Sequence, residues 1–173
     1  MPLKRFFSAA AIAAAFCLGL AAQAGGKAQP SADAALARDR LAIEATLQDY
    51  VRALDGSDLP AYLATLTEDA KFLSKEGNYY GRKAISDYVS PVMNARLKRA
   101  ASGTDTVKGT HHVISNIALR FVDLDHAVMT SYWMFVVAHK QGAATIEVMG
   151  SAEDHFVRQG GKWLISERHV ETL

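Results

Sequence analysis

The sequence predicts an α+β domain in which three helical segments precede an antiparallel sheet. In the first part of the chain, apolar residues recur at three- and four-residue intervals, the spacing of helices that bury one face. From residue 111 onwards the period changes to two, in strand-length runs separated by short turns. The composition agrees with one compact domain, because 50% of the 173 residues are hydrophobic and 21% are charged.

The N-terminal segment has the pattern of a secretory signal peptide. Lys4 and Arg5 precede an apolar run at 6–20, and Ala22-Gln23-Ala24 offers a small-x-small cleavage site. The run is shorter than the roughly 20 residues that cross a bilayer, so no membrane span is expected. Cys17, the only cysteine, lies in this run, which excludes cysteine-ligated metals and sulfur redox chemistry from the mature protein.

These features divide the chain into three expected parts. Residues 1–24 form the signal peptide, 25–30 a flexible leader without periodicity, and 31–173 the folded domain. The mature protein is expected to be exported, to the periplasm or outside the cell. Without disulfides its stability depends on the hydrophobic core, and a chain of about 150 residues can bury about 70% of its unfolded surface.

A long helix is expected from Ser31 to Asp55, because one apolar stripe runs along that segment. The stripe contains Leu36, Ile43, Leu47, Tyr50, Val51 and Leu54. The pair Asp55-Gly56 is expected to stop the helix. A second, shorter helix follows, with Ser57 or Asp58 as its N-cap and Pro60 in its first turn.

A third helical segment is expected to begin at Gly81, after a brief strand at 70–73. The dipeptide Ser90-Pro91 predicts an interruption there, because serine is a good N-cap and proline suits the first position of a new helix. The residues at 101–110 are mostly polar and predict a loop.

Four strands are expected at 111–121, 127–139, 145–157 and 162–170, joined by short turns into an antiparallel meander. The run 128–137 is apolar on both of its alternating faces, so both faces must be covered. Because the helices can cover only one of them, we expect a homodimer formed through sheet faces.

The charge balance and the motifs exclude several function classes. Lys plus Arg is 19 and Asp plus Glu is 18, so there is no basic excess to bind nucleic acid. The chain has no Ser/His/Asp order, phosphate-binding glycine loop or clustered His/Glu spacing. Hydrolase, nucleotide-binding and metalloenzyme functions are therefore unsupported, and no cofactor or metal is expected.

Five short motifs, occurring in order, carry a resemblance to a known family. They are Tyr50-Val51-Arg52-Ala53-Leu54-Asp55-Gly56-Ser57-Asp58, Thr67-Glu68-Asp69-Ala70, Gly81-Arg82-Lys83-Ala84-Ile85, Thr110-His111-His112-Val113, and Phe156-Val157-Arg158 leading into Gly161-Lys162-Trp163-Leu164-Ile165. Over about 35–170 the chain resembles the nuclear-transport-factor-2-like superfamily, in its SnoaL-like branch.

This resemblance implies a cone-shaped, curved antiparallel sheet wrapped around the N-terminal helix group. The helices would close the concave side of this half-barrel into an apolar pocket for a small molecule, often in a dimer. The branch is similar to polyketide cyclases, scytalone dehydratase and steroid isomerases, and it also contains many pockets of unknown use.

Asp55 and His112 are the candidate catalytic residues. The negative end of the helix macrodipole, together with burial in an apolar pocket, would raise the pKa of Asp55 and make its carboxylate a general base. The alternative is that Asp-Gly is only a helix-stopping turn. His111 and His112 are adjacent on a strand and point to opposite faces, so they cannot share a metal. The resemblance to scytalone-dehydratase-like members favours His112 as the partner that orients Asp55 or carries its proton.

Candidate ligand-binding residues are Tyr62, Trp133 and Phe135, whose aromatic faces suit flat apolar molecules, although core packing is the alternative. The dehydratase-like pattern implies a second pocket histidine where this chain has Val137, and His139 on the same face would substitute for it. The pattern also implies Ser and Asn near Gly150 and Ala152.

The sequence therefore predicts an exported domain that encloses a small apolar ligand. If it is an enzyme, it is a cofactor-independent lyase or isomerase that acts by proton transfer through Asp55 and His112, in a dehydration, isomerisation or cyclisation. Two alternatives remain open: a non-catalytic small-molecule-binding module, and a protein-interaction module whose exposed sheet face binds another protein.

Overall fold

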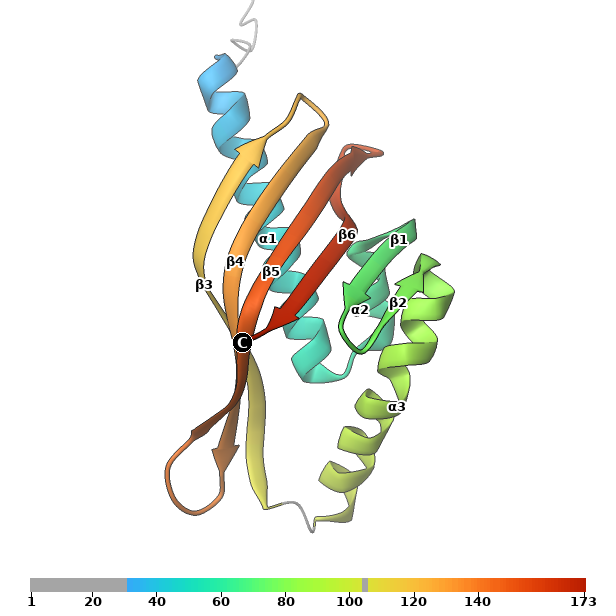
Figure 1. Cartoon of the computed structure of the whole chain (residues 1–173), viewed down its shortest axis with the longest axis vertical. Helices are drawn as coiled ribbons and strands as arrows, with labels where there is room; N and C mark the ends of the chain where they lie inside the picture. The colour runs from blue at the N-terminus through green and yellow to red at the C-terminus, as the bar shows by residue number, and fades with distance from the viewer. Residues whose placement is uncertain (1–30, 104–105) are drawn as a thin grey trace, which may run out of the picture.

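The computed structural model describes residues 31–103 and 106–173, so the expected signal peptide and leader lie outside the described residues (Figure 1). The elements in chain order are α1 (Ala32–Gly56), α2 (Leu59–Ala64), β1 (Leu66–Ser74), β2 (Gly77–Tyr80), α3 (Gly81–Ser102), β3 (Val107–Phe121), β4 (His126–His139), β5 (Thr145–Gln159) and β6 (Lys162–Thr172). Helices first and a sheet afterwards confirm the expected α+β class.

The six strands form one curved, open sheet in the order β2-β1-β6-β5-β4-β3. Neighbouring strands are antiparallel, except that β1 and β6 run parallel, a pairing that the expected meander did not include. In Figure 1, α1 runs behind the sheet and α3 lies beside β1 and β2. The core fills the space between the helices and the concave sheet face, with Ile43, Leu47, Ile85, Met129 and Phe156 fully buried.

The helix α1 agrees closely with its predicted range. The Ser31 side chain caps its N-terminus by accepting a hydrogen bond from the Ala34 amide, at 3.2 Å. At the other end the expected Asp55-Gly56 stop is displaced by one residue. Gly56 is still helical, and Ser57 takes the left-handed conformation, with φ of 57°. The turn into α2 therefore places a serine where glycine is usually preferred.

Asp58 is the N-cap of α2, and its side chain accepts a hydrogen bond from the Ala61 amide, as expected. The expected interruption of the third helix is wrong, because α3 continues through Pro91. Proline removes one helical hydrogen bond, but Val89 and Met93 on either side of it are buried in the core. Their burial holds the helix together, and α3 ends at Ser102, which shortens the expected polar loop.

The strands extend beyond the expected ranges. The strand expected at 70–73 belongs to the longer β1. The four-residue β2, which the residue pattern did not predict, pairs with β1 as a hairpin. β3 begins at Val107, and its register with β4 shifts between Ser115 and Ala118. Asn116, within this β-bulge, has a φ of 52° and bends the strand.

The convex face of the sheet carries an apolar patch, which we call the outer patch. It consists of Val113, Met134 and Met149, which lie directly opposite one another on β3, β4 and β5, together with Tyr132 and Ile146. Val113, Tyr132, Met149 and Ile146 are between 41% and 58% exposed. None of the helices in the described ranges is long and apolar enough to cross a membrane.

Candidate functional site

A cavity of about 370 Å³ lies between the concave face of the sheet and the three helices. This volume is within the range of small-molecule sites. Most of its lining is apolar or aromatic: Tyr50, Val51, Leu54, Tyr62, Phe72, Tyr88, Val89, Val92, Ile114, Trp133, Phe135, Val148 and Val170, with the polar residues Ser74, Glu76, Arg96, His112, Arg168 and Thr172. We call this space the apolar cavity.

Asp55 and His112 form a two-point contact at the wall of the apolar cavity. The backbone amide of His112 donates a hydrogen bond to Asp55 Oδ2 at 2.9 Å, and His112 Nδ1 lies 2.6 Å from Asp55 Oδ1. Their side chains are only 14% and 21% exposed, respectively. An ionised carboxylate requires a hydrogen on Nδ1, which leaves Nε2 as the unprotonated ring nitrogen of a neutral His112.

The fold positions this pair at an edge of the sheet. β3 is an edge strand, so the outward amide of His112 has no neighbouring strand to pair with and binds Asp55 instead. The ring of His112 packs against Phe135 of β4, with centroids 5.1 Å apart. His112 lines the apolar cavity, whereas His111 lines a separate cleft, so the two histidines point to opposite sides as their spacing predicts.

Arg96 of α3 holds the end of α1 in place. Its Nη1 donates to the carbonyl oxygens of Leu54 and Asp55, at 2.8 and 3.1 Å. The last turn of α1 has no basic residue of its own, so Arg96 supplies the positive charge that a helix C-terminus favours. Burial lowers the pKa of Arg96 from its usual value, and the nearby Asp55 carboxylate opposes that shift.

A second polar group lies on the cavity wall, formed by Arg168, Asp154, Tyr50 and Tyr62. Arg168 Nη1 contacts both carboxylate oxygens of Asp154, at 2.7 and 2.8 Å, and its guanidinium lies 4.8 Å from the centre of the Tyr50 ring. The hydroxyls of Tyr50 and Tyr62 are hydrogen-bonded at 3.0 Å. Arg168, Tyr50 and Tyr62 also line the apolar cavity.

Burial governs the ionisation of this second group. Burial raises the pKa of both tyrosine hydroxyls, so they remain hydrogen-bond donors. Burial is the largest effect on the pKa of Arg168 and lowers it, but the Asp154 carboxylate and the two tyrosines together outweigh burial, and the net shift is upward. The sequence alone does not predict a role for Arg168, because the alternation of a strand indicates which face a residue occupies but not whether that face meets a cavity.

The other candidate residues have different positions. Tyr62, Trp133 and Phe135 line the apolar cavity. His139 does not line it and instead contacts the Thr145 hydroxyl through Nε2, at 2.9 Å. Trp133 donates its indole N–H to the Ser151 carbonyl, and a Cβ on Gly150 would lie 2.8 Å from its ring. Gly150 therefore leaves room for Trp133 to lie against the sheet.

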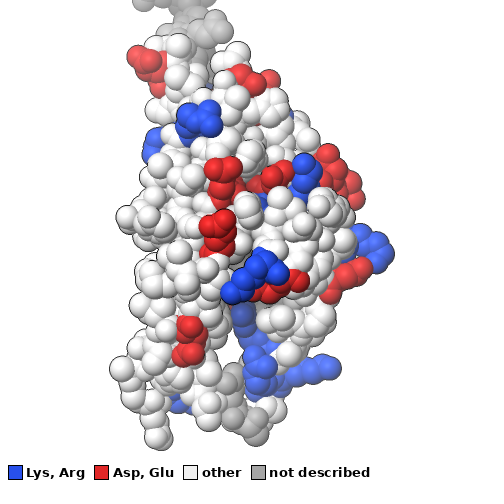
Figure 2. Space-filling model, in the orientation of Figure 1, with Lys and Arg blue, Asp and Glu red and all other residues white. Residues whose placement is uncertain are grey.

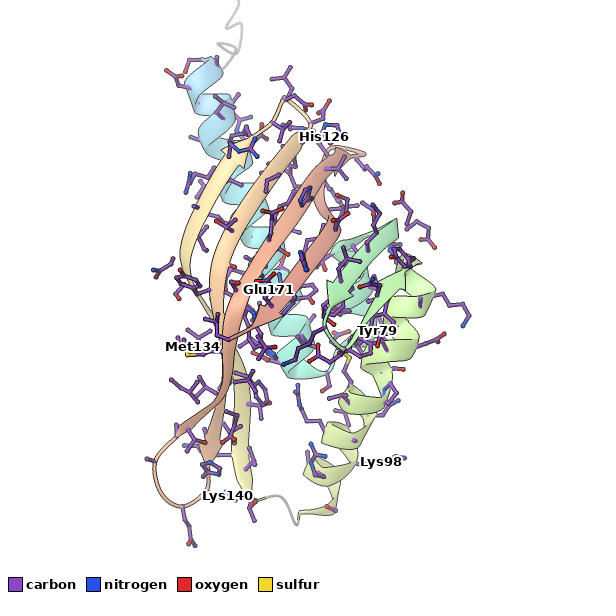
Figure 3. All side chains as sticks on the ribbon, in the orientation of Figure 1. Tyr79, Lys98, His126, Met134, Lys140 and Glu171 are labelled. Carbon is purple, nitrogen blue, oxygen red and sulfur yellow. The ribbon has the colours of Figure 1, made fainter. Side chains whose placement is uncertain are left out.

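Phe72 of β1 and Tyr88 of α3, which line the apolar cavity, form an aromatic cluster with Tyr79 of β2. Tyr79, labelled in Figure 3, stacks on Tyr88 with ring centroids 4.1 Å apart, and Phe72 packs against both rings. In residues 31–103 and 106–173, no cluster of three or more His, Cys, Asp or Glu side chains is arranged to hold a metal ion.

Comparison with known proteins finds one matching family and several solved structures with a similar fold. A family model described as a SnoaL-like domain matches residues 35–169. No curated protein matches the chain.

Three solved structures illustrate the structural likeness. The protein Rv3472 from Mycobacterium tuberculosis, described as of unknown function, has a TM-score of 0.67 and 22% identity, over 83% of this chain and 76% of that one. A putative scytalone dehydratase from Novosphingobium aromaticivorans has a TM-score of 0.60 and 23% identity, over 80% and 87%. A hexachlorocyclohexane dehydrochlorinase, LinA type 2, has a TM-score of 0.62 and 18% identity, over 81% and 88%. At these identities the likeness shows the shared fold alone.

Proposed function

Because the chain belongs to the SnoaL-like domain family, we propose that its apolar cavity binds a small apolar molecule and that His112 removes a proton from it. The observation that carries this proposal is the Asp55–His112 pair at the wall of that cavity. The site combines a candidate base with a mostly apolar space, an arrangement that suits proton transfer from carbon.

The geometry favours His112 as the base and Asp55 as the residue that positions it. Both oxygens of Asp55 are engaged by His112, so the carboxylate has no free oxygen directed at a ligand. Nε2 of His112 takes the proton, and the imidazolium that forms is stabilised by the carboxylate on Nδ1. This reverses the expected roles, in which Asp55 was the base.

The Arg168 group supports an elimination or isomerisation. One tyrosine hydroxyl donates to the other, so the guanidinium and the remaining hydroxyl hydrogen offer positive charge and hydrogen-bond donors to an oxygen or halogen that becomes electron-rich as the proton leaves. In an elimination, the C–H electron pair forms the new double bond and the leaving group departs with its bonding electrons. Two of the similar folds carry names that denote eliminations, a dehydratase and a dehydrochlorinase.

The test is turnover of a panel of β-hydroxy ketones and chlorinated cyclohexanes by the purified protein. Asp55→Asn and His112→Gln should each lower the rate by about 10² to 10⁴, and the double variant should lose little more, because the two residues act as a unit. His126→Gln is the matched control, since the contact of His126 with Asp123 has similar geometry but is more than half exposed. Ligand binding without turnover would favour the alternative, a non-catalytic binding module.

We also propose that the protein is exported, on the strength of the basic, apolar and small-residue pattern at 1–24. Mass spectrometry of the protein from its native host should find an N-terminus near Gly25. Recovery of an intact Met1 in the cytoplasm would contradict export.

We also propose that two copies associate through the outer patch, because strand β4 is apolar on both of its faces and the helices cover only one of them. A row of apolar side chains across three strands is unusual on the surface of a monomer.

A further inference from the structure

A second cleft, of about 630 Å³, lies on the opposite side of the Asp55–His112 pair from the apolar cavity. It is formed by the end of α1, the C-terminal part of α3, the beginning of β3 and the end of β4. Asp55 lines this cleft, His112 lines the apolar cavity, and Arg96 lines both. The candidate catalytic pair and Arg96 therefore lie where the two spaces adjoin. We call this second space the basic cleft.

The basic cleft gathers positive charge from three parts of the fold. Arg96 and Arg99 come from α3, Lys108 from β3, and Lys140 directly follows β4. Among residues 31–103 and 106–173, Arg99, Lys108 and Lys140 form no ion pair. Figure 2 shows Lys and Arg side chains gathered over the lower end of α3, where the cleft lies.

The acidic side chains of the basic cleft do not balance this charge. Among the lining residues that the structure describes, Asp55 is the only carboxylate, and both Asp55 oxygens already contact His112. The chain as a whole has a formal net charge of only +1, so the cations do not gather here because the protein is basic overall. Like charges that converge on one concave surface repel one another, and an anion in the cleft would relieve that repulsion.

We propose that the basic cleft binds the anionic group of an organic anion whose apolar body occupies the apolar cavity. This inference rests on the proposed function, because it takes the apolar cavity as the ligand site, and it narrows the ligand to an amphipathic carboxylate, phosphate or sulfonate. Arg99 and Lys140 contact the anionic group. Arg96 borders both spaces and lies beside the point where the apolar and charged parts of the ligand meet.

The test compares two fluorescent probes of similar shape. Anilinonaphthalene sulfonate carries a negative charge, and phenylnaphthylamine has the same aromatic body without it. Titration of the full chain should show tighter binding of the sulfonate, with an affinity that falls as salt is added. The two probes should displace each other competitively, because their aromatic bodies share the apolar cavity.

The variant Arg99→Gln/Lys140→Gln should weaken binding of the sulfonate by about tenfold, which is within the combined effect of two exposed charge contacts. Its binding of phenylnaphthylamine should be unchanged. The matched control is Lys98→Gln/Arg120→Gln, which removes the same charge from exposed residues outside the cleft. Lys98 adjoins Arg99 in sequence but points away from the sheet in Figure 3.

Three outcomes would overturn the proposal. Arg99→Gln/Lys140→Gln could weaken binding of both probes equally, or Lys98→Gln/Arg120→Gln could weaken binding of the sulfonate just as much. The third outcome is that the two probes bind without competing. The probe titrations require no turnover, so they are independent of the catalytic role of His112. Asp55→Asn and His112→Gln could leave turnover intact while Arg99→Gln/Lys140→Gln still weakened binding of the sulfonate. In that case the proposed mechanism would fail and the anion site would remain.

Discussion

At the scale of single residues, the contact between Asp55 and His112 determines which ring nitrogen carries the proton. In Asp55→Asn, the amide oxygen still accepts from the His112 backbone, and the amide nitrogen donates to Nδ1. The hydrogen of the neutral ring then moves to Nε2, which can no longer act as a base. We expect this variant to stay folded, to lose about 1 kcal/mol with the charge-assisted bond, and to lose nearly all turnover.

Nitrogen-15 chemical shifts of the His112 ring distinguish the two tautomers directly, without a known substrate. The wild type should show hydrogen on Nδ1 and Asp55→Asn should show it on Nε2. An unchanged tautomer in the variant would contradict the positioning role of Asp55.

The buried pair Tyr50 and Tyr62 predicts a loss of stability at high pH. Burial raises the pKa of both hydroxyls in the folded state, whereas in the unfolded chain they ionise at about 10. As the pH rises through that value the unfolded state loses protons that the folded state keeps, so the free energy of unfolding falls. Denaturation with urea between about pH 8 and pH 11 should show this fall.

Tyr62→Phe is the variant that isolates this effect. It removes one of the two hydroxyls whose pKa is raised by burial. The free energy of unfolding of the variant should therefore fall less steeply with pH than that of the wild type. Identical slopes for the two proteins would contradict the assignment.

The candidate catalytic pair could be expected from the sequence, but the Arg168 group could not. A helix-end aspartate and a strand histidine occur in short motifs that resemble a family, and alternation separates His112 from its neighbour. Arg168 and Asp154 are brought together by the register between β5 and β6. That register depends on turn geometry and on the bulge at Ser166 of β6, neither of which the residue pattern determines.

At the scale of elements, the turn between α1 and α2 contains a strained backbone conformation that a single substitution should relieve. Ser57 has a φ of 57°, and its buried hydroxyl lacks a hydrogen-bond partner among the described residues. Ser57→Gly should relieve both features and raise the free energy of unfolding by about 0.5 to 1 kcal/mol.

Urea denaturation measures this gain, and Ser57→Ala is the control. Alanine removes the hydroxyl but keeps the backbone strain, so glycine should be the more stable of the two. Equal stability of the two variants would show that the left-handed conformation carries no cost here.

The helices were more predictable than the strands because their caps and apolar stripes are local in sequence. Ser31 and Asp58 cap the helices that their positions predict. The predicted interruption at Pro91 was wrong, because burial of the neighbouring residues outweighs the preference of proline to interrupt a helix. The four-residue β2 carries too short a pattern to recognise, and its place depends on pairing with β1.

At the scale of the whole molecule, the outer patch predicts a homodimer. Light scattering at micromolar concentration should give twice the mass of one chain. Met134→Lys places a charge between Val113 and Met149 and should give a monomer. Leu124→Lys is the control, because Leu124 is 78% exposed in the turn between β3 and β4, outside the patch. A wild-type monomer, or a dimer in both variants, would contradict this interface.

The position of β6 has a consequence for the order in which the protein folds. β6 is the last strand in chain order, yet it lies between β1 and β5 and joins the two parts of the sheet. The hairpin β1–β2 and the meander β3–β5 can each form early from contacts within them, but they meet only when β6 enters between them. A nascent chain that lacks residues 162–172 therefore cannot close its core. Such delayed closure would keep the chain unfolded until its last strand is available, as the proposed export requires.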